Sequence, residues 1–242
     1  MKKNSNLEHL FIVKLPRYSM MIFILCIGVA MNVYPGGIYH MVGETGERMC
    51  PGVSCVDPGH HTIGYSFFKN FLSDLGRTTS HSEENNFHSS LLFNMVLTFA
   101  GVTYILFYLN IRKVFNNNFL ASLGSFFGIC GAVCFIGVAF TPADLLLKPH
   151  IAFNHWIFRF FLASILCYSW IMYKSHDIDN KYIIGNLVFI FSLVSYIFIL
   201  IYGPTPRDPG GLEFQAISQK FIMFNFFGSI IIQTIGFSKV VK

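Results

Sequence analysis

The sequence predicts an all-α membrane protein, a bundle of six transmembrane helices that forms one integral domain over residues 1–242. Charged residues are only 12% of the chain and apolar residues 53%, whereas soluble domains have about 25% and 45–50%. Six stretches have the roughly 20 apolar residues that a helix needs to cross a bilayer. The 28 phenylalanines also exceed what the interior of a soluble domain of this size would hold. The predicted spans are residues 18–39, 89–110, 119–140, 151–173, 182–202 and 215–237.

The distribution of lysine and arginine predicts which ends of the spans face the cytoplasm. Short loops rich in these residues stay on the cytoplasmic side of a membrane. We therefore expect both termini inside and the long loop 40–88 outside, in a plasma or inner membrane. The scattering of the basic residues among loops argues against nucleic-acid binding. The residues predicted to be cytoplasmic are Lys2, Lys3, Lys14, Arg17, Arg112, Lys113, Lys174, Lys181, Lys239 and Lys242.

The first span has a basic start and the small residues Gly28-Val29-Ala30, a pattern that also fits a cleaved signal peptide. Its apolar run continues to Tyr34 and ends at Pro35-Gly36-Gly37. That length favours a span that is retained in the mature protein, although the sequence leaves cleavage open.

The outer loop contains a cysteine pair and a predicted interfacial helix. Cys50 and Cys55 are separated by four residues and flanked by prolines and glycines, which favours a disulfide in an exported segment. A pair of metal ligands is the alternative. Apolar residues recur at helical spacing from Thr62 to Leu75, followed by Gly76 as a C-terminal cap. A phenylalanine-rich amphipathic helix of this kind is expected to lie at the membrane interface.

The third span contains glycines at the spacing that allows a neighbouring helix to approach closely. Gly124 and Gly128 are four residues apart, and Gly131 follows one turn later. Packing drives helix association in lipid, so we expect this span to be central. No inverted repeat is evident, which weakens a transporter hypothesis.

Four polar side chains lie in the outer parts of the predicted spans. Arg159 is eight residues into span four, about 12 Å from its outer end. His155 precedes it by one turn, Lys220 lies in span six and Asn94 in span two. Ionisable residues inside a membrane are costly and therefore candidates for function. One interpretation is a structural pair between Arg159 and a loop carboxylate, Asp74 or Asp144. The other is recognition of an anionic group such as a lipid phosphate, which the planar guanidinium suits.

Seven of the nine histidines fall on the predicted outer side. Histidine acts as an acid, a base or a metal ligand near neutral pH. An intramembrane lipid hydrolase or transferase would use Asp74 or His88 as its general base, with Arg159 stabilising the developing anion. A zinc site built from Asp74, His88, Asp144 and a histidine of span four is geometrically possible, but no tight ligand motif supports it. The sequence therefore predicts no cofactor and leaves zinc open.

A family resemblance rests on the run Ser73-Asp74-Leu75-Gly76-Arg77, on Leu92-Phe93-Asn94 and on Asp144 and His150 before span four. These residues resemble domain-of-unknown-function family 998, a set of prokaryotic multi-span membrane proteins, and more distantly the damage-regulated autophagy modulator group. The resemblance covers about residues 60–170. It implies a helical membrane bundle without an established activity. The matching polar positions are Ser73, Asp74, Gly76, Asn94, Asp144 and His150.

The leading hypothesis is an integral membrane protein whose outer-facing polar pocket binds a lipid headgroup or a small anion. A lipid hydrolase or transferase is the first alternative and a small-solute transporter the second. Membrane lipids are the expected partners, and the oligomeric state is open. The candidate ligand-binding residues are Arg77, Asn94, Asp144, His150, His155, Arg159 and Lys220.

Overall fold

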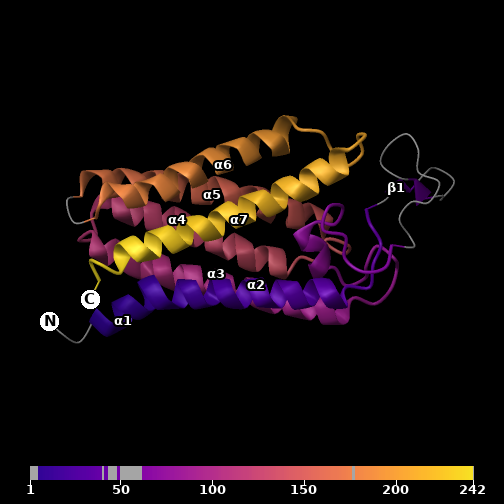
Figure 1. Cartoon of the computed structure of the whole chain (residues 1–242), viewed down its shortest axis with the longest axis horizontal. Coiled ribbons are helices and arrows are strands. Elements are labelled where there is room, and N and C mark those ends of the chain that lie inside the picture. The colour runs from indigo at the N-terminus through magenta and orange to yellow at the C-terminus, as the bar shows by residue number, and fades with distance from the viewer. Residues whose placement is uncertain (1–4, 40, 43–47, 50–61, 176–177, 242) are drawn as a thin grey trace.

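All six predicted spans are helices in the computed structural model, which describes residues 5–39, 41–42, 48–49, 62–175 and 178–241. Each helix is long and apolar enough to cross a membrane, which indicates an integral membrane protein. The helices run side by side in one bundle (Figure 1). Their bounds are α2 Leu15–Val33, α3 Phe87–Val114, α4 Phe119–Ala139, α5 Leu147–Lys174, α6 Ile183–Tyr202 and α7 Gly211–Phe237.

The first crossing helix begins earlier and ends earlier than predicted. Helix α1 (Ser5–His9) and the π-helix η1 (Leu10–Lys14) lead into α2, which ends at Val33 rather than at residue 39. Pro16 lies in the first turn of α2 and has no N–H to donate to the preceding turn, so the π-helical turn before it accommodates the missing bond.

Local sequence explains the connections at both ends of the bundle. After α3, Asn116 and Asn117 adopt positive φ angles of 54° and 50°, a conformation that asparagine tolerates. Asn118 then caps α4 by accepting a hydrogen bond from the N–H of Ala121 at 2.7 Å. Gly210, with φ 71°, is the N-cap residue of α7. The short 3-10 helix η3 (Asn180–Tyr182) precedes α6.

The small-residue face of α4 packs as the sequence predicted. A Cβ atom at Gly128 would lie 2.4 Å from the ring of Tyr108 on α3, and one at Gly131 would lie 3.1 Å from Phe161 on α5. Helix α4 therefore lies closely against both α3 and α5. The four cysteines within the spans are free thiols, namely Cys26, Cys130, Cys134 and Cys167.

Helix α1 and the C-terminal end of α7 lie at the same end of the bundle, which we call the terminal end (Figure 1). Residues 62–86 fold over the opposite end, and we call this segment the cap. The two-residue strands β1 (Met41–Val42) and β2 (Arg48–Met49) pair antiparallel beyond the cap. Cys50 and Cys55, the predicted disulfide pair, lie outside the described residues.

The interfacial helix predicted over Thr62–Leu75 is wrong in extent, because only the 3-10 helix η2 (Leu72–Gly76) forms. Thr62 and Gly64 instead pair through their backbones with Gly37 and Pro35, at 2.8 and 3.0 Å. These bonds hold the start of the segment extended. A tight turn over residues 66–70 follows, in which Asn70 accepts a hydrogen bond from the N–H of Ser66 at 2.9 Å.

Candidate functional site

The carboxylate of Asp74 lies at the centre of the cap and is only 5% exposed. Helix η2 places it where its Oδ2 accepts hydrogen bonds from the N–H of Phe71 at 2.8 Å and from Nδ2 of Asn70 at 3.3 Å. Its Oδ1 lies 3.3 Å from Nε2 of His81. Asn70 is fully buried and also donates to the carbonyl of Gly37 at 2.9 Å. Asp74 thus joins parts of the cap to one another, and Asn70 links the cap to the chain that follows α2.

The surroundings of Asp74 keep it ionised. Burial on its own would raise the pKa of this carboxyl, but the charge and hydrogen bond of His81, the charge of Arg77 and the N–H of Phe71 together lower the pKa below its ordinary value. Burial and the negative charge of Asp74 raise the pKa of Tyr34, whose hydroxyl accepts a hydrogen bond from the N–H of His81 at 3.3 Å. Asp74 is therefore a stable anion and a weak base at neutral pH.

Helix α7 contacts the cap through two buried side chains. Lys220 Nζ donates to the carbonyl of Asn70 at 2.6 Å and to that of Ala216 at 3.1 Å, and it lies 5.1 Å from the ring centre of Phe67. Gln219 accepts a hydrogen bond from the N–H of Leu72 at 2.7 Å. The ammonium of Lys220 therefore forms its hydrogen bonds within the protein.

Asp144 and His150, two predicted ligand-binding residues, also make structural contacts at the cap end. Asp144 accepts hydrogen bonds from the N–H groups of Thr78 and Thr79 at 3.0 to 3.1 Å and from the hydroxyl of Thr78. Burial raises the pKa of Asp144, but these bonds outweigh it and lower the pKa. His150 Nδ1 lies 2.6 Å from the carbonyl of Thr141 and must therefore carry the proton of that bond. Its buried Nε2 has no partner in the described part of the chain.

The structure does not bring Arg159 to the loop carboxylates. Its Nη1 donates to the carbonyl of His155 on the same helix at 2.8 Å, and its guanidinium lies 5.8 Å from the ring centre of Trp156. The pair with Asp74 or Asp144, one of the two interpretations of the sequence, is absent among the described residues, and both acids instead bind groups of the cap. Helix α5 begins at Leu147, so Arg159 lies about 18 Å along it rather than 12 Å.

Two further predicted residues lie apart from Asp74. His88 is exposed and its ring contacts that of Phe87, with ring centres 5.6 Å apart. Asn94 lines a groove of about 520 Å³ between the cap ends of α3 and α4, together with Ser90 and Thr98. Arg77, by contrast, is part of the cap, and its Nε donates to the carbonyl of Thr79 at 3.0 Å.

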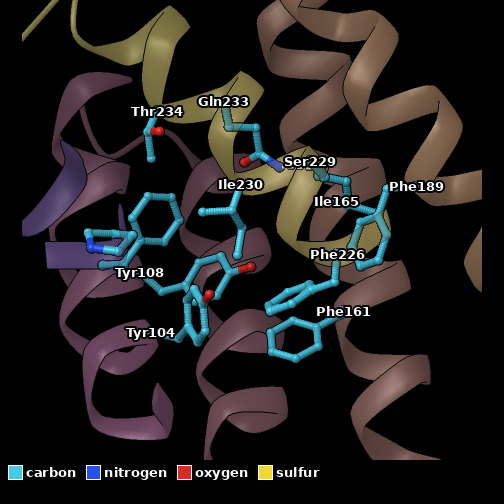
Figure 2. A pocket seen from close by; sticks show the side chains of 12 residues that line it. Tyr104, Tyr108, Phe161, Ile165, Phe189, Phe226, Ser229, Ile230, Gln233 and Thr234 are labelled. Carbon is cyan, nitrogen blue, oxygen red and sulfur yellow. Dashed lines mark hydrogen bonds between the residues drawn. The ribbon is translucent and has the colours of Figure 1, made fainter. Parts of the chain in front are cut away.

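A second polar location lies deep in the bundle, in a cavity of about 20 Å³ (Figure 2). Tyr104 and Tyr108 of α3 and Ser229, Gln233 and Thr234 of α7 line it among aromatic rings. The volume is sufficient for one water molecule. Sequence reasoning did not identify this cavity, because its polar residues come from two helices that are distant in sequence.

No three histidine, cysteine, aspartate or glutamate side chains of the described residues come together as a metal site. Sequence reasoning also missed Asn70, and it counted His81 among the outer histidines without assigning it a partner. A glycine pair at Gly36-Gly37, where φ is 142° and 80°, was the available signal that the chain folds back tightly at this point.

No family model, no curated protein and no solved structure matches this chain.

Proposed function

We propose that this integral membrane protein binds an anionic phosphate, that of a lipid headgroup or of a small anion, at Arg159. The observation that carries the proposal is a guanidinium inside an apolar span with one hydrogen bond to its own helix and no carboxylate within ion-pair distance among the described residues. The ring of Trp156 beside it is 51% exposed on the outside of the bundle.

A charge in this position needs an anion more than any other cation of the cap half does. A central arginine costs about 2.5–3.5 kcal/mol on membrane-insertion scales. Side chains on a helix lean toward its N-terminus, so the guanidinium of Arg159 lies toward the cap end of α5. Its remaining N–H groups match the oxygens of a phosphate, and the face of Trp156 stabilises the cation further.

Three other charged side chains at the cap end are already matched within the protein. Asp74 faces His81, Asp144 is bound by Thr78, and Lys220 donates to two carbonyls. This balance supports a structural role for the cap and leaves recognition to Arg159. The hydrolase alternative gains no support from these contacts, since Asp74 is fully engaged and His88 lies apart. The resemblance to family 998 and its autophagy-modulator relatives stays a prediction.

We also propose that the cap end faces out of the cytoplasm. The terminal end carries Arg112, Lys113, Lys174 and Lys181 in short connections, which is the distribution expected of a cytoplasmic face. Reporter fusions after residue 65 and at the C-terminus test this orientation. They are expected on opposite sides of the membrane, and finding them on the same side contradicts it.

Native mass spectrometry of protein extracted in mild detergent tests the phosphate site. We expect wild type to retain a phospholipid that Arg159→Ala loses, while Arg207→Ala keeps it, because Arg207 is an exposed cation of the loop 203–210 at the same end. Inorganic phosphate titrated into delipidated protein distinguishes a small anion from a lipid. Equal retention by all three proteins and no phosphate binding would refute the proposal.

The folding of the variants is checked by thermal unfolding in the same detergent. Arg159→Lys keeps the charge without the planar fork, and it should retain part of the binding. Metal analysis of the same wild-type sample tests for zinc: a stoichiometric metal would favour the enzyme alternative.

A further inference from the structure

A groove of about 540 Å³ lies at the terminal end of the bundle, opposite the cap. It is bounded by the turn between α3 and α4 and by the last turns of α5. Asn116 and Asn118 of the turn form its polar side, and Phe119 and Trp170 form its apolar side. Both aromatic side chains are largely exposed, at 81% and 57%.

Lys174 extends over the aromatic side of this groove. Its Nζ lies 5.3 Å from the ring centre of Trp170 and 5.9 Å from that of Tyr173. In the described part of the chain, it makes no ion pair with a carboxylate. A lysine over aromatic faces keeps its three N–H donors available to an anion. The groove therefore contains a positioned cation that no carboxylate of the described residues neutralises.

Neighbouring charges add to this positive potential. Arg112 and Lys113 lie in the last turn of α3, immediately before the turn that bounds the groove. The buried Nε of Arg112 has no partner among the described residues. In the connection that follows α5, the carboxylate of Asp179 pairs with Lys181 at 2.5 Å. Basic pockets between transmembrane helices at a membrane surface are suited to anionic lipid headgroups.

We propose that the groove binds one anionic phospholipid from the leaflet at the terminal end. Its phosphate lies beside Lys174, and its glycerol and upper acyl region cover Phe119 and Trp170. The exposed rings fit this occupant, since tryptophan is enriched at the boundary between headgroups and acyl chains and the ring of Phe119 offers apolar surface to the chains. This site is separate from Arg159, which lies on the cap side of α5 and four turns away at about 3.6 residues per turn.

Native mass spectrometry with added lipid tests the site. Purified protein in detergent is titrated with phosphatidylglycerol and, in parallel, with phosphatidylcholine. Wild type is expected to bind one phosphatidylglycerol in preference to phosphatidylcholine. Lys174→Ala should weaken that binding about fivefold, the effect of one basic residue near a charged headgroup. Lys174→Arg should retain it.

Lys181→Ala is the matched control, because it removes the same charge from the same end at a lysine already paired with Asp179. It should bind phosphatidylglycerol like wild type, and Arg159→Ala should retain the phosphatidylglycerol binding that depends on Lys174. Equal weakening by Lys181→Ala would show general surface attraction and overturn the site. Unchanged binding by Lys174→Ala would also overturn it. Each variant should unfold at the same temperature as wild type, which shows that a change in lipid binding does not come from a change in folding.

Discussion

The replacement Asp74→Ala should open the cap without unfolding the bundle. Three donors lose their acceptor, namely the N–H of Phe71, Nδ2 of Asn70 and Nε2 of His81. Removing one partner of a buried pair costs about 3–5 kcal/mol. Since 1.4 kcal/mol corresponds to a factor of ten, amide hydrogen exchange in residues 65–80 should accelerate by about 100-fold or more.

Hydrogen exchange with mass spectrometry measures this change by segment. Asp208→Ala is the control, because Asp208 also accepts from a nearby backbone N–H, that of Thr205 at 2.6 Å, but is exposed. The amide hydrogens of the cap should exchange in Asp208→Ala at the wild-type rate. Unchanged exchange of residues 65–80 in Asp74→Ala would refute the assignment of Asp74 as the central acceptor. Uniform acceleration of all six helices would refute the view that the cap opens separately.

Three further outcomes are expected. The stabilisation from ionised Asp74 should be complete above its ordinary pKa of 3.8 and lost as pH falls through its lower pKa in the folded protein. The unfolding temperatures of wild type and Asp74→Asn should therefore differ at pH 6 and converge in acid. Thr78→Ala should lower stability by about 1.5–3 kcal/mol through its bond to Asp144, while Thr79→Ala, whose side chain is exposed, should change little in the same denaturation assay. Gly128→Ala should cost about 1–3 kcal/mol against the ring of Tyr108, whereas Gly28→Ala, with no neighbour within 4 Å, should leave the unfolding temperature unchanged or slightly higher.

The bundle was predictable because lipid allows few alternatives for an apolar segment. Spans two to six begin and end within about four residues of their predictions, since a bilayer of fixed thickness sets helix length. The glycines of α4 were informative for the same reason, because close packing is what joins helices in lipid.

The cap was not predictable, because its partners come from distant parts of the chain. Phe67 and Phe71 have helical spacing, but the extended pairing of Thr62 with Gly37 prevents a helix before them. The different partners of Arg159 and Lys220, both candidate ligand-binding residues, were not predictable for a related reason. Lys220 faces inward to Asn70, whereas Arg159 turns back along α5. Sequence spacing gives depth along a helix, but it does not give the direction in which the helix faces.

The spacing of the two tryptophans of α5 bears on the thickness of the membrane around this protein. Trp156 and Trp170 each lie under a cation, and 14 residues of helix separate them by about 21 Å. A hydrocarbon layer is about 30 Å thick. Were both indoles at interfaces, the lipid beside α5 would have to thin by several ångströms, a mismatch that would favour thinner membranes and shorter acyl chains. Such thinning would draw headgroups inward to Arg159 on one side of the bilayer and Lys174 on the other.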